Sequence, residues 1–261
     1  MTAIREGWII TQRDLFHWVR QPATPLFGMA FNIMILLMFA FLFGGAIEVP
    51  GGNRGDYIDF LLPGMFALTM LFGLDGTMTA ISTDSQKGVT DRFRSMPISS
   101  SAVVLGRSGA DLTNSIVDLL ILMVGGLLIG WRITGDFGSA LLAILLLIWL
   151  RFAFLWIGIF AGLTVTSPGA ATGIQILVWP VGFLSSVFVS PETMPGWLGA
   201  IAQWNPISST ATAARQLFGN PTGLTGGWFE DNAILLAFVL PLVLTAVFLP
   251  LSARAYRRLR S

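Results

Sequence analysis

The sequence predicts an all-α polytopic membrane protein with six transmembrane helices. Hydrophobic residues make up 54% of the 261 residues and charged residues only 11%, and the mean hydropathy is +0.75. Soluble domains carry charges at roughly a quarter of their positions. Apolar stretches of about 20 residues, long enough to cross a bilayer as a helix, also recur along the chain. Because several of them lack the polar face of a soluble helix, a soluble protein with a large core is excluded.

The six expected spans are separated by shorter polar segments. Their ranges are 25–46, 58–84, 102–130, 138–165, 169–190 and 230–251. Before them, residues 1–22 are expected to form an amphipathic helix that lies in the membrane interface, since Ile4, Trp8 and Trp18 share one face. After them, residues 252–261 form a short charged tail. We expect the whole chain, 1–261, to be a single membrane domain with its bundle over 25–251.

The basic residues give the bundle an orientation. Eleven lie in the first 22 residues, in residues 85–107 up to the start of span three, or in the tail: Arg5, Arg13, Arg20, Lys87, Arg92, Arg94, Arg107, Arg254, Arg257, Arg258 and Arg260. Only Arg54, Arg132 and Arg215 lie on the other side. Because cytoplasmic segments carry the excess of Lys and Arg, both termini are predicted to be cytoplasmic.

The sequence lacks the residues that several kinds of catalysis and metal binding require. The chain has no cysteine and a single histidine, His17, which excludes disulfides, thiolate nucleophiles and a histidine or cysteine metal cluster. It also lacks the G-x-x-x-x-G-K-[ST] loop that binds nucleotide phosphates and the H-E-x-x-H metal motif. We therefore expect no catalytic residues, no bound metal or cofactor, and no ATPase activity in this chain itself.

Polar residues inside the expected spans are the first candidate site. They follow helical spacings on three spans: Asp75 and Thr79, then Asp111, Asn114 and Asp118, then Arg151. Ionisable groups at membrane depth are costly and usually face a bundle interior or a water-filled cavity. Two interpretations stay open. Arg151 pairs with Asp118 or Asp75 to staple neighbouring spans, or these residues line the path of a transported molecule or proton.

A cationic segment between spans two and three is the second candidate site. It reads KGVTDRFRSMPISSSAVVLG over residues 87–106. Residues 91–96 can form a short amphipathic turn with Phe93 and Met96 on one face, and Pro97 limits its continuation. The simpler alternative is that its arginines only hold the topology by binding anionic headgroups.

The same segment carries a family resemblance. DSQKGVTDRFRSMPISSSAVVLGRSGADL is similar to the signature E/Q-x-G-x-x-x-R-x-x-x-x-P-x-S of type-2 ABC transporter permeases of the daunorubicin-resistance class. A second match is SPETMPGWLGAIAQWNPISSTATAARQLFGN, where this family shows P…MP-x-W…NP…R before its last span. The resemblance covers nearly the whole chain, including the number of spans and their orientation.

The resemblance implies partners and roles. A permease of this kind dimerises with a second copy or a related permease in a bacterial cytoplasmic (inner) membrane, and binds two copies of a separately encoded ABC ATPase that carries ATP and Mg. The principal coupling helix to the ATPase would contain Gly88, Asp91, Arg92, Phe93, Arg94, Met96 and Pro97. The smaller contact would be the turn with Thr166, Ser167 and Pro168. Short outer helices would form an external gate with Met194, Pro195, Trp197, Asn205, Pro206 and Arg215.

The implied function is ATP-driven efflux, as in antibiotic resistance. The cargo would be an amphipathic drug, lipid or glycoconjugate taken from the cytoplasm or the inner leaflet, with no nucleic acid involved. The alternative is a proton-coupled efflux protein that works without an ATPase and uses Asp75, Asp111 or Asp118 as its titrating group. Neither the identity of the substrate nor the choice between homodimer and heterodimer follows from the sequence.

Overall fold

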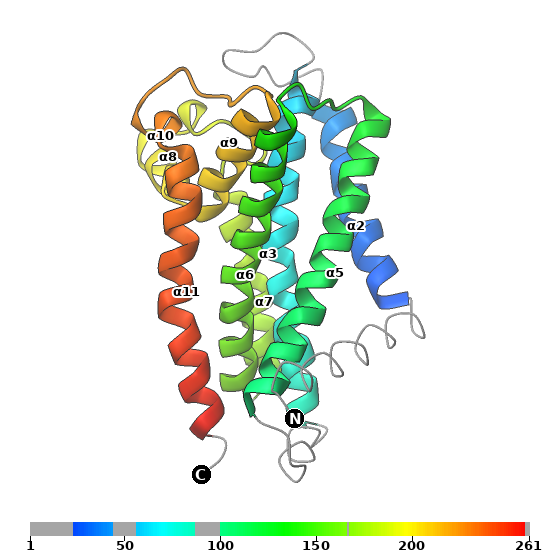
Figure 1. Ribbon diagram of the computed structural model, residues 1–261, viewed down its shortest axis with the longest axis vertical. Coiled ribbons are helices and arrows are strands. Elements are labelled where there is room, and N and C mark those ends of the chain that lie inside the picture. Colours follow the sequence, from blue (N-terminus) through cyan, green and yellow to red (C-terminus); the bar gives the residue numbers. More distant parts are fainter. Residues whose placement is uncertain (1–22, 44–55, 87–99, 166, 259–261) are drawn as a thin grey trace.

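The computed structural model describes residues 23–43, 56–86, 100–165 and 167–258. These residues form helices and connecting loops, with no strand among them (Figure 1). The elements are α2 (Ala23–Phe43), α3 (Tyr57–Gln86), α5 (Ser100–Ile129), α6 (Phe137–Thr164), α7 (Pro168–Phe183), η1 (Pro191–Thr193), α8 (Gly196–Gln203), α9 (Pro206–Phe218), α10 (Trp228–Asp231) and α11 (Ala233–Arg258). The predicted all-α class is confirmed.

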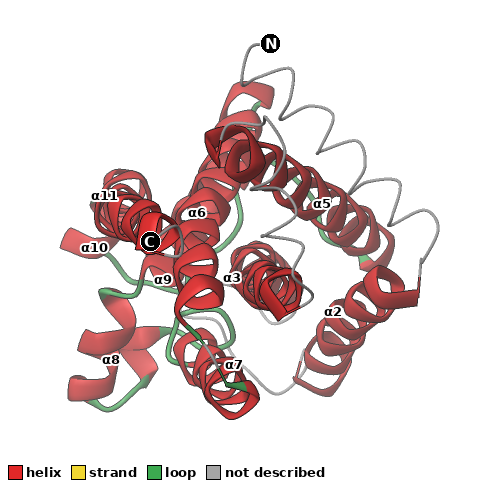
Figure 2. Ribbon diagram, turned by 90° about the horizontal axis from the view of Figure 1, so that it is seen from below, coloured by secondary structure: helices red, strands yellow, loops and turns green. Residues whose placement is uncertain are grey.

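Four helices in the described part are long and apolar enough to cross a membrane: α3, α5, α6 and α11. Two shorter apolar stretches, Phe27–Leu42 in α2 and Gly169–Phe183 in α7, run alongside them (Figures 1 and 2). Six crossings are therefore not confirmed, although all six predicted segments contain a helix. The expected interfacial helix, 1–22, lies outside the described residues.

The central helix of the bundle is α3. It contacts α2, α5, α6, α7 and α9, and Figure 2 shows it surrounded by the other long helices. Every residue from Phe60 to Leu71 is buried, which explains why this stretch has no polar face. Beside it, α6 packs against both α3 and α11, and the Trp149 indole donates a hydrogen bond to the carbonyl of Phe238 at 3.0 Å.

The fifth predicted span, 169–190, extends too far. The helix ends at Phe183, and the amide of Leu184 closes the last turn on the carbonyl of Pro180 at 2.7 Å. The chain can leave the helix here because a side chain from another element, Asn205, binds the carbonyls of Val181 and Leu184. At the other end of the sequence, α11 continues to Arg258, so most of the expected tail, 252–261, belongs to this helix.

The predicted start of the fourth span, residue 138, agrees closely with α6. Asp136 caps this helix by accepting hydrogen bonds from the hydroxyl and the amide of Ser139, at 2.7 and 3.1 Å. The same two bonds hold the pKa of the Asp136 carboxyl below its usual range. An aspartate before an apolar run is a local signal for a helix start, which is why this boundary was predictable.

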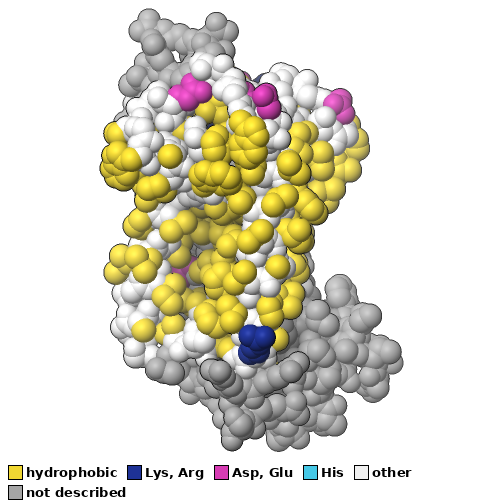
Figure 3. All heavy atoms as spheres, turned by 90° about the vertical axis from the view of Figure 1, so that its left-hand side faces the viewer, with side chains coloured by type: hydrophobic (Ala, Val, Ile, Leu, Met, Phe, Trp, Pro, Cys, Tyr) yellow, Lys and Arg dark blue, Asp and Glu magenta, His cyan; other side chains and the backbone are white. Residues whose placement is uncertain are grey.

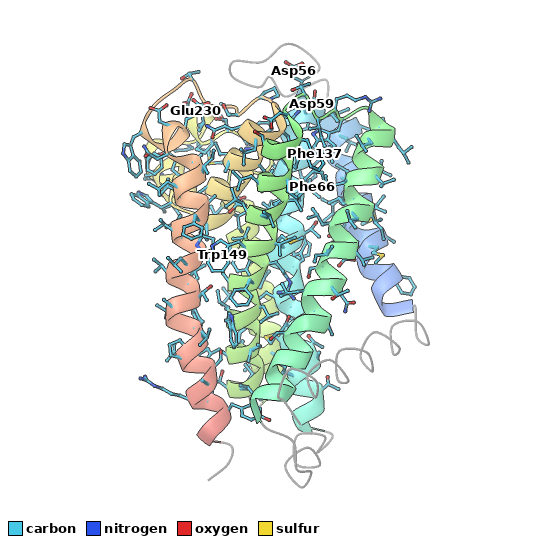
Figure 4. The ribbon with its side chains drawn as sticks, in the orientation of Figure 1. Asp56, Asp59, Phe66, Phe137, Trp149 and Glu230 are labelled. Carbon is cyan, nitrogen blue, oxygen red and sulfur yellow. The ribbon has the colours of Figure 1, made fainter. Side chains whose placement is uncertain are left out.

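Charge and apolar surface are arranged by height in the bundle. The C-terminal ends of α3 and α11 and the N-terminal ends of α5 and α7 lie at one end, below in Figure 1, and α8, α9 and α10 lie at the other. Acidic side chains including Asp56, Asp59 and Glu230 gather at that upper end (Figure 4). The face in Figure 3 shows an apolar band between this acidic rim and a basic group near the lower end.

Candidate functional site

Polar positions on α3 divide between two sides of the helix. Gly73 lies against α6, because a Cβ on it would stand 2.6 Å from the Nε of Arg151. Thr79 lies against α7, where its Oγ1 accepts a hydrogen bond from Gln175 Nε2 at 3.3 Å. Asp75 is four residues before Thr79 and shares its side of the helix. The two sides therefore form two different polar sites.

The first site surrounds the guanidinium of Arg151, which is only 2% exposed. Its Nε donates to Ser115 Oγ on α5 at 2.7 Å, and its Nη2 donates to Thr77 Oγ1 on α3 at 2.8 Å. The hydroxyl of Thr77 in turn donates to Asp111 Oδ2 at 2.9 Å. We call Arg151, Ser115, Thr77 and Asp111 the arginine node. It joins α3, α5 and α6 at mid-height in the bundle.

The node differs from the charge pairs expected from the sequence. Among the described residues, Arg151 makes its hydrogen bonds to two hydroxyls, and neither Asp118 nor Asp75 accepts one from it. Asp118 still interacts electrostatically with Arg151, whereas Asp75 faces α7. Ser115 shares α5 with Asp118, and Thr77 shares α3 with Asp75, so the position on each helix and not the choice of helix decides which side chain bonds the guanidinium. Thr77 and Gly73 were not predicted, since a threonine and a glycine carry no charge signal.

The second site is the seam between α3 and α7. The rings of Phe72 on α3 and Trp179 on α7 lie 4.9 Å apart between centroids, and Phe31 of α2 meets Trp179 edge-on at 5.6 Å. Further along α3, four residues after Asp75, Thr79 accepts the hydrogen bond from Gln175. One carboxylate oxygen, Asp75 Oδ1, is buried and has no hydrogen-bond partner among the described residues. This seam combines aromatic rings with an unsatisfied carboxylate.

Two polar side chains from the predicted gate hold together the end of the bundle that carries α8, α9 and α10. Asn205 caps α9, since its Oδ1 accepts the amide of Ile207 at 2.9 Å. Its Nδ2 also donates to the carbonyls of Val181 and Leu184, both at 2.8 Å. One amide side chain therefore stabilises the end of α7 and the start of α9 together.

The second of these side chains is Arg215, which is fully buried. Its Nε donates to the carbonyl of Phe60 on α3 at 2.7 Å, and its Nη2 donates to the carbonyls of Ser186 and Val187 at 2.8 and 3.2 Å. The guanidinium also lies over the ring of Phe60, 3.6 Å from its centroid. Its Nη1 donates to the hydroxyl of Ser186 at 3.4 Å. Arg215 thus joins α9 to α3 and to the turn that follows α7.

The remaining predicted gate residues occupy the turns around α8. Met194 and Pro195 connect η1 to α8, and Pro206 is the first residue of α9. Trp197 on α8 is 69% exposed. Asn205 and Arg215 therefore both bond the stretch from Val181 to Val187 at the end of α7, whereas Trp197 is exposed.

The comparisons with known proteins agree with this architecture. The sequence matches the profile of the ABC-2 type transporter family over residues 5–218. The chain belongs to the ABC-2 type transporter family. It is 38% identical over 226 residues to the daunorubicin resistance ABC transporter permease protein DrrB1 of Streptomyces coeruleorubidus, covering 86% of this chain and 76% of that protein.

Two more distant relatives also match most of the chain. Two proteins described as transport permease ycf38 match it, one from Cyanophora paradoxa at 23% identity and one from Porphyra purpurea at 24%. These matches cover 90% and 83% of this chain, and 80% and 75% of the two relatives. The predicted family is confirmed: this chain is a multi-pass, non-catalytic membrane subunit of an ABC transporter.

Membership places the ATP-binding step on another chain. ABC-2 permeases pair with an ABC ATPase, which binds the ATP. Within the described part of this permease, no group of three or more His, Cys, Asp or Glu residues could hold a metal ion.

Most residues of the predicted coupling contacts lie outside the described part of the permease. These are Gly88, Asp91, Arg92, Phe93, Arg94, Met96, Pro97 and Thr166. The helix that follows Thr166 begins at Pro168, and the hydroxyl of Ser167 caps it by accepting the amide of Ala170 at 3.3 Å. This cap lies at the same end of the bundle as the last residues of α3 and the first residues of α5 (Figure 1).

Proposed function

We propose that this permease is the membrane subunit of an ATP-driven exporter that moves an amphipathic drug, lipid or glycoconjugate outward. The observation that carries the proposal is the 38% identity to a permease named for daunorubicin resistance. Export starts from the cytoplasm or the inner leaflet, in a bacterial cytoplasmic membrane. The working complex contains two permease chains, identical or related, and two ABC ATPase subunits carrying ATP and Mg.

The seam between α3 and α7 supports an amphipathic cargo. Phe72 and Trp179 supply apolar contact area, while Asp75 and Thr79 supply polar groups one turn away. Intramembrane polar groups of this kind mark substrate and ion pathways in many transporters. A cargo with an apolar body and a polar group therefore matches both halves of the seam.

Coupling to the ATPase is assigned to two cytoplasmic segments. The principal one is the segment from Gly88 to Pro97, and the smaller one is the turn from Thr166 to Pro168. Phe93 would fill a groove on the ATPase while Arg92 and Arg94 pair with carboxylates at its rim. Both termini lie on this cytoplasmic side, as the distribution of basic residues indicates.

The second candidate function is proton-coupled efflux without an ATPase. The observation in its favour is the number of carboxylates inside the bundle: Asp75, Asp111 and Asp118. Against it, Asp111 accepts a hydrogen bond within the arginine node and Asp118 interacts with Arg151. This alternative would rest on Asp75, whose Oδ1 is buried and has no hydrogen-bond partner among the described residues.

Reconstitution separates the two functions. Proteoliposomes containing the permease with its ATPase should export an amphipathic dye when ATP is supplied, and the permease alone should not respond to a pH gradient. Replacing Phe93→Ala together with Arg94→Glu should abolish cargo-stimulated ATP hydrolysis while the permease still inserts into the membrane. Transport by the permease alone under a pH gradient would overturn the proposal, and normal coupling in the double variant would remove the role of this segment.

A further inference from the structure

Asp75 lies on the seam between α3 and α7 by its position in the helix. Phe72 contacts Trp179 and Thr79 bonds Gln175, so the residues on both sides of Asp75 touch α7. Asp75 follows Phe72 by three residues and precedes Thr79 by four, spacings that keep side chains on one helical face. On α7, Gln175 and Trp179 are also four residues apart. The carboxylate is therefore bracketed by an aromatic contact and an amide–hydroxyl bond.

The carboxylate is incompletely satisfied. Asp75 Oδ1 is buried and accepts no hydrogen bond from the described residues. In a membrane interior a polar atom without a partner costs several kcal/mol. The other two intramembrane carboxylates differ, because Asp111 accepts the hydroxyl of Thr77 and Asp118 interacts electrostatically with Arg151. Asp75 is the intramembrane carboxylate for which the described residues supply neither kind of partner.

There is room beside Asp75 for another molecule. Gly76 is exposed, and a Cβ built on it would meet no atom within 4 Å. By contrast, a Cβ on Gly73, three residues earlier, would meet the side chain of Arg151. The aromatic side of the seam is also accessible, since Trp179 is 36% exposed and Phe31 is 37% exposed. Open space, accessible rings and an unsatisfied acceptor occur together at this one place.

We infer that Asp75, Phe72, Trp179 and the space beside Gly76 form a subsite for the protonated amine of an aromatic amphiphile. The ammonium group donates to Asp75 in a charge-assisted hydrogen bond, which supplies the missing partner. The aromatic part of the cargo packs against Phe72 and Trp179, whose ring faces also attract the cation. The inference rests on the proposed export function, because it names the chemical class of the cargo and the residue that selects it.

Two probes that differ in one group test the inference. Pyrenemethylamine is protonated at neutral pH, whereas pyrenemethanol has the same ring system and no charge. The purified permease–ATPase complex is placed in nanodiscs for binding by fluorescence anisotropy and in proteoliposomes for ATP-dependent export. The wild-type complex should bind and export the amine in preference to the alcohol.

Asp75→Asn removes the charge at nearly constant shape. It should weaken binding of the amine by about 10- to 100-fold, the size of one charge-assisted hydrogen bond, and leave binding of the alcohol unchanged. The matched control is Asp59→Asn, the same change on the same helix at its outer end, where Asp59 accepts the amide of Arg132 at 3.2 Å. This control should retain the preference of the wild-type protein for the amine.

A second variant keeps the test decisive if Asp75→Asn fails to fold. Gly76→Leu fills the space beside the carboxylate and should weaken binding of both probes, with the complex still eluting as a single species. Equal loss of amine and alcohol in Asp75→Asn, no loss of either, or wild-type binding without preference for the amine would each overturn the subsite. Absence of ATP-dependent export in the wild-type complex would instead contradict the proposed function, while nanodisc binding would still decide the role of Asp75.

Discussion

Glycines on α3 show how a single missing side chain shapes a membrane site. Gly73 leaves the space that Arg151 fills: an added Cβ would stand 2.6 Å from its Nε and 2.8 Å from its Cζ. The guanidinium is held by hydrogen bonds to Ser115 and Thr77, so it cannot move without losing them. An arginine could therefore be buried in this apolar bundle because α3 has no side chain at this position.

Replacing each glycine with alanine should separate these roles. Gly73→Ala should lower the free energy of unfolding by about 1–3 kcal/mol, the usual cost of overpacking, and displace the guanidinium from the arginine node. Gly76→Ala, one turn away on the same helix, should leave thermal stability at the wild-type value or above it, because its Cβ meets no atom within 4 Å. Thermal unfolding followed by tryptophan fluorescence in nanodiscs measures both. Equal melting temperatures for the two variants would contradict the packing of Arg151 against Gly73.

At the scale of elements, α7 and α9 are held in place by side chains that form hydrogen bonds to more than one element. Asn205 serves both the end of α7 and the start of α9. Arg215 links α9 to α3 and to the turn after α7. Because these bonds connect three or more elements, a movement of α9 must be accompanied by rearrangement at the end of α7.

Asn205→Ala should therefore destabilise the end of the bundle that carries α8, α9 and α10 by more than the loss of a single helix cap would. Loss of a cap costs about 1 kcal/mol, and the carbonyls of Val181 and Leu184 are left without their donor as well. The matched control is Ser167→Ala, which removes the cap of α7 at its opposite end, where the Ser167 hydroxyl accepts the amide of Ala170. Hydrogen–deuterium exchange should increase across both α7 and α9 in Asn205→Ala. Faster exchange confined to α9 would show that Asn205 does not hold the end of α7.

For the whole molecule, the arrangement of charge predicts which end faces the cytoplasm. Acidic side chains including Asp56, Asp59 and Glu230 lie at the end with α8–α10 (Figure 4). Arg254 belongs to the last turns of α11, whose C-terminal end lies at the opposite end (Figure 1). The positive-inside rule assigns the end with Arg254 to the cytoplasm. The proposed coupling segments come before α5 and α7 in the sequence, and the first residues of these two helices lie at that same end (Figure 1).

Cysteine labelling tests this orientation, because the chain contains no cysteine. Asp231→Cys, at an exposed position on α10, should react with a membrane-impermeant maleimide in intact cells. Ala253→Cys, at an exposed position near the end of α11, should react only after permeabilisation. The opposite pattern would place the coupling segments on the outer side and would contradict the proposed contact with an ATPase.

Local signals account for the parts of the fold that the sequence predicted well. The long apolar runs of α3, α5, α6 and α11 and the cap at Asp136 depend on neighbouring residues, so they can be read from a short stretch. The end of α7 could not be read in this way, because Asn205 acts on it from 21 to 24 residues away. The hydrogen-bond partners of Arg151 could not be read from the sequence for a related reason, since the two hydroxyls that accept from it lie on other helices.

The sequence by itself determined that this is a helical membrane permease whose 261 residues contain no nucleotide-binding loop motif, and it marked the polar residues worth testing. Hydropathy, basic residues and motifs are properties of composition and spacing, which need no fold to be recognised. Only the tertiary structure decided that Asp75 and Arg151 belong to different sites. Asp75 is on the side of α3 that faces α7, whereas Arg151 of α6 packs against the other side, at Gly73. The angle between two side chains on a helix is known from spacing, but the neighbour that each one meets depends on how the helices pack.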